Sequence, residues 1–121
     1  MIYNNLGLSL QQKGPFSDSI AQYKVAIKVN PSNYEPYIDI GNILLKQKMT
    51  EEAIDYYKRA IAFKPDSSMA YYNMGRALAQ KGEMKEAINH YRETVRLKPD
   101  LVSARKNLEM ALLQLEEYEH K

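Results

Sequence analysis

Few residues in this chain are of the types that perform covalent chemistry or hold metals. Its 121 residues include no cysteine and two histidines, His90 and His120. Glu86 precedes His90 by four residues, which would place both on one face of a helix. A lone histidine–carboxylate pair at this spacing is more often a solvated surface pair than a catalytic dyad or a metal site. No glycine-rich loop has phosphate-binding spacing. We therefore predict a chain that is not an enzyme and that uses no cofactor or metal.

A second set of polar side chains is distinguished by its spacing. Asn5, Asp39, Asn73 and Asn107 lie 34 residues apart, so they would form a ladder if the chain repeats at that interval. An asparagine amide offers two donors and an acceptor, which can pair with the backbone of an extended peptide whatever its sequence. Asparagine in such a column also often solvates the helix or bonds within the array. Peptide binding and solvation are both open readings of the ladder.

The 34-residue interval runs through the whole chain. Prolines, glycines, tyrosines and leucines recur at it: Pro31, Pro65 and Pro99; Gly7, Gly41 and Gly75; Tyr3, Tyr37 and Tyr71; Tyr23, Tyr57 and Tyr91; Leu10, Leu44 and Leu78. A strict period of this length indicates an array of identical supersecondary units.

Each unit contains two helical patterns separated by a short break. Apolar residues recur at three- and four-residue steps over about 34–48 and 51–63, and Thr50 is placed to cap the second of these helices. Pro65 ends it, because proline cannot continue a helix. The same pattern predicts helices over about 2–12, 17–29, 69–80 and 84–97, and Asp100 would cap a last helix over about 101–118. We predict an all-α protein with seven helices.

Glycines occur inside three of these helices, where each costs about 1 kcal/mol relative to alanine. Gly7, Gly41 and Gly75 share one register, which implies a steric reason. We expect a close approach of the partner helix, which would offer the small residues Ala26, Ala60 and Thr94, with Tyr23, Tyr57 and Tyr91 filling the space around each contact.

The recurring pattern Tyr-x-x-(Leu/Ile/Met)-Gly-x-x-Leu, then Ala-Ile-x-x-Tyr-x-x-Ala and then Pro resembles the tetratricopeptide repeat. The resemblance implies a single domain over 1–121, a right-handed α-solenoid of antiparallel helix pairs. Its repeats would span about 1–33, 34–67 and 68–101, followed by a capping helix over about 101–118. Two departures are mild: Ser19 replaces a usual alanine, and Lys48 stands where the turn glycines Gly14 and Gly82 do.

The last helix departs from the pattern. Glu109 occupies the glycine register and Arg105 the tyrosine register, so we expect no second helix to pack there. Its inner face would consist of Leu108, Ala111, Leu112 and Leu115, with a polar outer face, as a terminal cap requires. By contrast, apolar residues begin almost at Met1, so we expect the C-terminal end of a longer array or an excision from one.

The resemblance also implies a concave groove lined by the first helix of every unit. We expect a non-catalytic scaffold that binds a peptide or an amphipathic helix there. The residues that the resemblance assigns to the groove are Asn5, Leu8, Ile38, Asp39, Asn42, Leu45, Met69, Tyr72, Asn73, Arg76, Asn107 and Met110. The apolar members are either exposed anchors or contacts between adjacent units, and Leu45 and Tyr72 are the favoured anchors.

One variant of this family clamps the C-terminal carboxylate of heat-shock chaperones with lysines, an arginine and asparagines. The matching positions here are Asn4, Leu8, Asp39, Met69 and Asn73. None of them is basic, and Asp39 would repel a carboxylate, so we expect no docking of chaperone tails.

Two alternatives remain open. The chain could self-assemble through an uncapped N-terminal face at Ile2 and Leu6, or it could be the targeting arm of a larger enzyme such as a glycosyltransferase. The net charge of +2, with both signs interspersed, gives no basis for nucleic-acid binding. No apolar run is long enough to span a bilayer and no signal peptide is recognisable, so we expect no membrane insertion and a cytoplasmic location.

Overall fold

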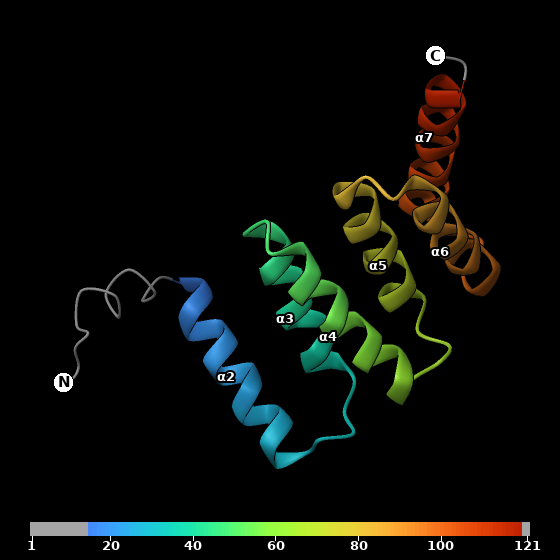
Figure 1. Ribbon diagram of the computed structural model, residues 1–121. Coiled ribbons are helices and arrows are strands. Elements are labelled where there is room, and N and C mark those ends of the chain that lie inside the picture. The colour runs from blue at the N-terminus through green and yellow to red at the C-terminus, as the bar shows by residue number, and fades with distance from the viewer. Residues whose placement is uncertain (1–14, 120–121) are drawn as a thin grey trace.

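The computed structural model describes residues 15–119, which form six helices and no strand (Figure 1). The helices are α2 (Pro15–Val29), α3 (Glu35–Lys46), α4 (Thr50–Phe63), α5 (Ser68–Lys81), α6 (Met84–Leu97) and α7 (Val102–Glu119). Their ends lie within two residues of the predicted ones, and those of α6 coincide with them. The helix predicted over 2–12 lies outside the described residues, so the all-α class is confirmed for this part of the chain.

The helices stack in a row, with α2 at one end and α7 at the other (Figure 1). Each helix packs against the next one along the chain, and α3 also contacts α5. The first helices of the second and third repeats are therefore in direct contact with each other, in addition to the contact between α4 and α5. Within the described residues, no helix combines the length and apolar character needed to cross a membrane.

The repeated prolines act through the residue before them. Lys64 and Lys98, which precede Pro65 and Pro99, have nearly identical dihedral angles, with φ of −138° and −142° and ψ of 86° and 82°. A following proline disfavours the helical region, so both helices end at the same point of the unit. At Pro31, the carbonyl oxygen accepts a 3.0 Å hydrogen bond from the Tyr37 hydroxyl, which ties this connection to α3.

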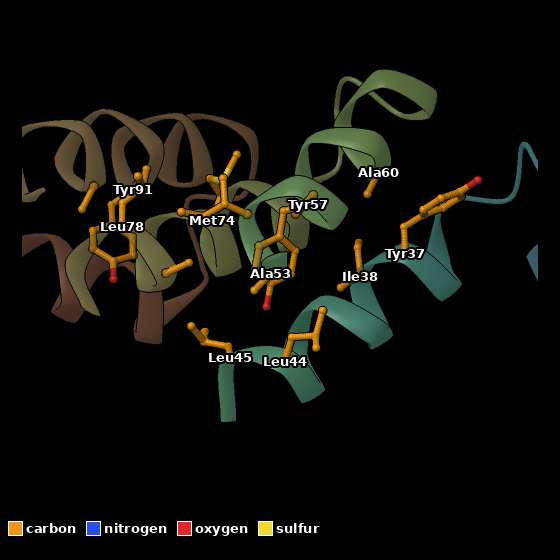
Figure 2. Close-up of a cluster of buried hydrophobic side chains, with 14 of the residues drawn as sticks. Tyr37, Ile38, Leu44, Leu45, Ala53, Tyr57, Ala60, Met74, Leu78 and Tyr91 are labelled. Carbon is orange, nitrogen blue, oxygen red and sulfur yellow. The ribbon is translucent and has the colours of Figure 1, made fainter. Parts of the chain in front are cut away.

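The glycines inside the helices are required by tyrosine rings. A Cβ atom at Gly41 would lie 2.5 Å from Cε1 of Tyr57, and one at Gly75 would lie 2.6 Å from Cε1 of Tyr91. Both tyrosines are buried in the core, Tyr57 completely (Figure 2). The expected close approach is therefore made by the ring itself and not by the neighbouring helix. Gly7 lies outside the described residues.

The remaining core is built from small and branched side chains of successive helices. Ala53, Ala60, Ala77 and Ala87 are fully buried, and Thr94 takes the place of an alanine in α6. The Thr94 hydroxyl donates a 2.8 Å hydrogen bond to the carbonyl oxygen of His90, which satisfies the hydroxyl without a partner from another helix. These small residues allow adjacent helices to approach closely.

Two expected helix caps are wrong. Thr50 is the first residue of α4 instead of its cap, and its hydroxyl donates a 2.7 Å hydrogen bond to the side-chain oxygen of Gln80 in α5. Asp100 precedes α7 by two residues, since that helix begins at Val102. A cap that the sequence analysis missed is Ser67, whose hydroxyl oxygen accepts a 3.2 Å hydrogen bond from the backbone N–H of Ala70.

The turns inside the second and third units have the same geometry. Lys48 has a φ of 65° and Gly82 a φ of 93°, both in the left-handed region. In each turn this residue and the next donate backbone hydrogen bonds to the preceding helix: Lys48 to Leu45, Met49 to Leu44, Gly82 to Ala79 and Glu83 to Leu78. This is the Schellman arrangement, in which glycine is the favoured residue. Lys48 therefore adopts a left-handed backbone conformation that glycine adopts more easily.

The terminal helix is less polar than expected. Ala104 and Ala111 are buried, and Leu108 and Leu115 pack against the core. Leu112 was expected beside them but is 38% exposed, and Tyr118 is 77% exposed. Leu112 occupies the register at which a second helix packs in the preceding units, so it has little to cover it within the described chain.

The turn geometry predicts that Lys48→Gly stabilises the fold. A left-handed conformation strains a residue that has a Cβ, whereas glycine adopts it freely. We expect the free energy of unfolding to rise by about 0.5–1 kcal/mol, after allowing for the greater entropy of glycine in the unfolded chain. Urea titration followed by circular dichroism measures this change. Lys48→Ala is the control, because it removes the same charge but keeps the strain; an equal gain in both variants would contradict the explanation.

The contact between glycine and tyrosine predicts that Gly75→Ala destabilises the protein, although alanine is the better helix former. The new methyl group would overlap the Tyr91 ring, and overpacking of this kind outweighs the gain in helix propensity. We expect the free energy of unfolding to fall by about 1–2 kcal/mol. In a Tyr91→Leu background the added methyl group should cost much less, so a double-mutant cycle measures the coupling. An equal cost in both backgrounds would argue against the ring contact.

Candidate functional site

The polar residues that recur every 34 positions lie on the first helices of the units but in unequal surroundings. Asp39 on α3 and Asn107 on α7 are half-buried, whereas Asn73 on α5 is only 2% exposed. Asn5 lies outside the described residues. The repeat thus places three members at equivalent points of the stack, but they differ in burial.

A hollow of about 510 Å³ opens between α3, the α4–α5 connection and the start of α5. Most of the lining residues have polar side chains, and Ile38 and Met69 are the apolar ones. Its lining consists of Tyr34, Glu35, Ile38, Asp39, Asn42, Lys64, Asp66, Ser67, Ser68, Met69 and Asn73. Five of the predicted groove residues, Ile38, Asp39, Asn42, Met69 and Asn73, are therefore brought together here. The connection residues were not predicted, although their position directly before a groove helix is a signal that could have found them.

Asn73 is the least satisfied polar group of this hollow. Its side-chain oxygen accepts a 3.2 Å hydrogen bond from Nη1 of Arg76, one turn later on α5. Its Nδ2 atom is buried and has no hydrogen-bond partner among the described residues. An unpaired buried amide costs about 1–3 kcal/mol. The amide is therefore a donor that stands ready for an acceptor placed in the hollow.

Asp39 is the second group that the hollow holds at a cost. Burial raises the pKa of its carboxyl group above the ordinary value of 3.8, and repulsion from Glu35, one turn earlier on α3, raises it further. Neither carboxylate forms an ion pair with another described residue, whereas Lys64 and Asp66 at the rim pair with each other at 2.9 Å. The hollow therefore has two carboxylates without a cationic partner in the described chain.

Four predicted groove residues, Asn42, Tyr72, Arg76 and Asn107, make contacts within the chain. The Tyr57 hydroxyl donates a 2.6 Å hydrogen bond to the side-chain oxygen of Asn42, and burial raises the pKa of that hydroxyl. Nδ2 of Asn107 donates a 3.3 Å hydrogen bond to the Tyr72 hydroxyl, and the guanidinium of Arg76 lies 5.9 Å from the centroid of the Tyr72 ring. The bond between Asn107 and Tyr72 joins α7 to the preceding unit, so this member of the ladder already has a partner.

The expected apolar anchors divide into two groups. Leu45 and Ile38 are only 4% and 8% exposed, so the expectation that Leu45 is an exposed anchor is wrong; both belong to the core between units. Met69 and Met110 are 44% and 57% exposed. Tyr72 is half-buried and packs against the core. Leu8 lies outside the described residues.

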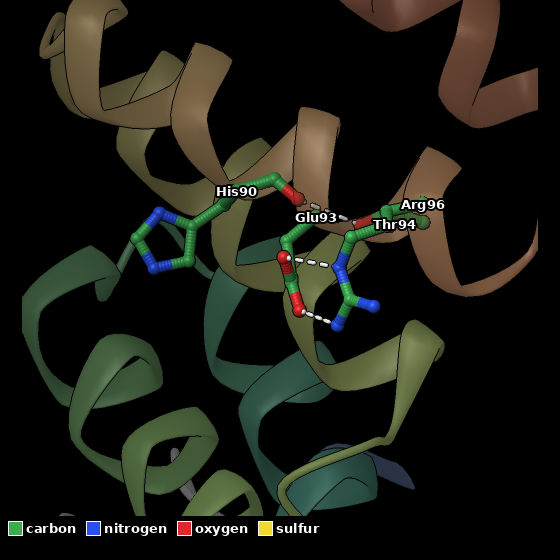
Figure 3. Close-up of polar contacts among 4 residues, drawn as sticks. All are labelled: His90, Glu93, Thr94 and Arg96. Carbon is green, nitrogen blue, oxygen red and sulfur yellow. Dashed lines mark hydrogen bonds and ion pairs between the residues drawn. The ribbon is translucent and has the colours of Figure 1, made fainter.

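His90 and Glu86 do not form a dyad through their side chains. Nδ1 of His90 lies 2.9 Å from the backbone carbonyl oxygen of Glu86, and the imidazole ring lies 6.0 Å from the ring of Tyr71. Figure 3 shows the polar contacts of the next turn, where the carboxylate of Glu93 binds Arg96. Over residues 15–119, no group of three or more histidine, aspartate or glutamate side chains could hold a metal ion.

The raised pKa of Asp39 predicts that Asp39→Asn stabilises the protein at neutral pH. The folded state binds this proton more tightly than the unfolded chain, so the stability it contributes is present below 3.8 and is lost as pH rises through the raised pKa. The variant should therefore unfold at higher urea concentration than the wild type at pH 7, and the gain should vanish below pH 3.8. Asp55→Asn, on the exposed face of α4, is the control. Lower stability of Asp39→Asn at pH 7 would contradict the assignment.

A family model described as TPR repeat matches residues 41–82, and one described as tetratricopeptide repeat matches residues 68–101. No curated protein sequence matches the chain.

Three solved structures with the same fold match this chain over different shares of their own length. MamA superposes with a TM-score of 0.78 at 24% identity, over 94% of this chain and 67% of MamA. The first TPR of Spaghetti (RPAP3), bound to the HSP90 peptide SRMEEVD, gives 0.82 at 19% identity, over 95% and 91%. YrrB, described as a TPR protein with an unusual peptide-binding site, gives 0.74 at 26% identity, over 78% and 48%.

The two family models together extend over residues 41–101, and they agree with the repeated proline, glycine and tyrosine contacts of the fold. The chain belongs to the tetratricopeptide repeat family.

Proposed function

We propose that this chain is a non-catalytic protein-interaction module that holds a peptide along the surface formed by α3, α5 and α7. The observation that carries the proposal is the buried, unpaired amide donor of Asn73 at the hollow between α3 and α5. Buried polar groups in folded proteins nearly always have a partner, and an exception calls for an explanation. A bound peptide that supplies an acceptor is that explanation.

An extended segment fits this donor better than a helical one. Backbone carbonyl groups of a helix are already bonded within the helix, so they have little capacity for the Asn73 amide. The carbonyl groups of an extended peptide are free to accept. Of the two partners expected from the sequence, we therefore favour the extended peptide over the amphipathic helix.

Exposed methionines supply the apolar part of the contact. Met69 at the rim of the hollow and Met110 on α7 are both about half exposed. Methionine is flexible and adapts to side chains of different shape. A short segment held by one buried hydrogen bond and a few such contacts would bind in the micromolar range, about −8 kcal/mol.

Neighbouring structures agree with peptide binding as a class. YrrB is described by its peptide-binding site, and the RPAP3 domain was solved with SRMEEVD, whose last residues include three acidic side chains. Glu35 and Asp39 of this chain would repel such a segment, which supports a different class of peptide. Self-assembly at Ile2 and Leu6 stays a prediction, since both residues lie outside the described range. A role as the targeting arm of an enzyme also stays a prediction.

The proposal predicts that Met69→Ala weakens peptide binding while Met49→Ala does not. Both methionines are about equally exposed, at 44% and 40%, but Met49 lies in the α3–α4 turn, at the opposite end of α3 from the hollow. Short random peptides displayed on phage would be selected against the intact chain, and the enriched sequences measured as fluorescent synthetic peptides. We expect Met69→Ala to weaken binding about fivefold, which is the effect of losing part of one apolar contact.

Met49→Ala should bind these peptides within about twofold of the wild type. Equal losses in the two methionine variants, or a selection that enriches no peptide, would contradict the proposed binding surface.

A further inference from the structure

The charged residues that line the hollow indicate which class of peptide side chain it would attract. Glu35 and Asp39 both line it, one turn apart on α3, and neither has an ion pair among the described residues. Lys64 and Asp66, the other charged residues of the lining, neutralise each other at 2.9 Å. The remaining charge of the hollow is negative, although the whole chain has a net charge of +2.

The position of Asp39 is not explained by the helix alone. Glu35 lies in the first turn of α3, where the helix dipole favours a carboxylate. Asp39 lies one turn later, where that effect has faded, and its carboxyl group is partly buried beside a like charge. A cation placed between the two carboxylates would remove the repulsion and the unfavourable burial together.

Apolar and hydrogen-bonding groups line the same hollow as these carboxylates. The side chains of Ile38 and Met69 provide apolar surface along which the methylene groups of a lysine or arginine could lie. Asn73, 98% buried, contributes the unpaired Nδ2 donor to the same hollow. An amide nitrogen cannot accept from an ammonium or guanidinium group, so its natural partner is a carbonyl oxygen of the same peptide.

Resting on the proposed function above, we propose that this hollow selects a basic side chain of an extended peptide. The carboxylates of Glu35 and Asp39 pair with the cation, while the Asn73 amide donates to a neighbouring backbone carbonyl oxygen. The peptide's lysine or arginine gives specificity, and the backbone contact gives a hydrogen bond that does not depend on sequence.

Parallel phage selections test the charge preference. Short random peptides would be selected against the intact chain, against Asp39→Asn and against the control Asp55→Asn, which removes an exposed carboxylate of α4. We expect lysine and arginine to be enriched with the wild type and with Asp55→Asn but not with Asp39→Asn. Equal enrichment in all three selections, or none with the wild type, would overturn the proposal.

A synthetic peptide from the wild-type selection then separates the cation from the rest of the contact. Replacing its lysine or arginine by norleucine keeps the apolar stem and removes the charge. We expect this replacement to weaken binding to the wild type about tenfold, as for a charge-assisted hydrogen bond, and binding to Asp39→Asn by less than about threefold. Equal losses with both proteins would overturn the pairing.

Asn73→Leu tests the amide donor by two readouts at once. Leucine is similar in size and needs no hydrogen bond, so the melting temperature should be unchanged or higher while the affinity for the same peptide falls about fivefold. Unchanged affinity in a folded variant would overturn the role of Asn73. If the variant does not fold, Asn73→Ser, which keeps a shorter donor, is expected to bind less tightly than the wild type, and undiminished affinity would overturn the role in the same way.

Failure of this inference is distinguishable from failure of the proposed function. Peptides that require Met69 but show no preference for basic residues would leave peptide binding standing and overturn only the charge selection. A selection that enriches no peptide, or peptides that are indifferent to Met69→Ala, would overturn both.

Discussion

The rings of Tyr57 and Tyr91 fix the distance between the two helices of a unit, and the rest of the array depends on that distance. Each ring lies so close to a glycine of the preceding helix that even a methyl group would overlap it. Because the second helix of one unit also packs against the first helix of the next, as α4 does against α5, this spacing is passed along the stack. In the second unit the same ring also reaches the groove side, where its hydroxyl holds the amide of Asn42. The core contact thus sets the position of a groove residue.

Two groups that line the hollow are held at an energetic disadvantage. Asn73 keeps a buried donor without a partner, and Asp39 keeps a carboxyl group whose charge is disfavoured by burial and by Glu35. Elsewhere the described chain satisfies comparable groups: the buried hydroxyl of Thr94 bonds to His90, and Asn107 bonds to Tyr72. The unpaired amide of Asn73 and the disfavoured charge of Asp39 are therefore the observations on which the proposed peptide site rests.

The sequence predicts the fold well because the residues that repeat every 34 positions are also the ones that make the core contacts. Helix ends near Pro65 and Pro99 follow from the restriction that proline imposes on the residue before it, and Gly41 and Gly75 follow from the tyrosine rings. The left-handed conformation of Lys48 agrees with its alignment with Gly82 in the repeat. The helix cap predicted at Thr50 was wrong. A hydroxyl directly before two acidic residues is a good local cap, but this hydroxyl bonds to Gln80, which belongs to another unit and cannot be identified from the local sequence.

The candidate site was less accessible to the sequence, because burial at a groove position depends on the neighbouring unit. Leu45 and Met69 both belong to the apolar set assigned to the groove, yet one is in the core and the other is exposed. Asp39 and Asn73 share one register, but Asn73 is the more buried. A register of 34 residues identifies which column a side chain occupies, not what covers it.

The location of the hollow also explains how a repeat protein can vary one binding position without disturbing the others. Its walls come from the first helices of two consecutive units and from the connection between them, so it is a property of one junction. The equivalent register at α7 is occupied differently, with Asn107 bonded to Tyr72 of the previous unit. Since stability in such arrays is approximately a sum of unit and nearest-neighbour terms, a charge introduced at one junction is confined to it. The specificity proposed for Asp39 would therefore cost stability at its own junction alone, while the tyrosine–glycine contacts keep the helices of each unit at their fixed spacing.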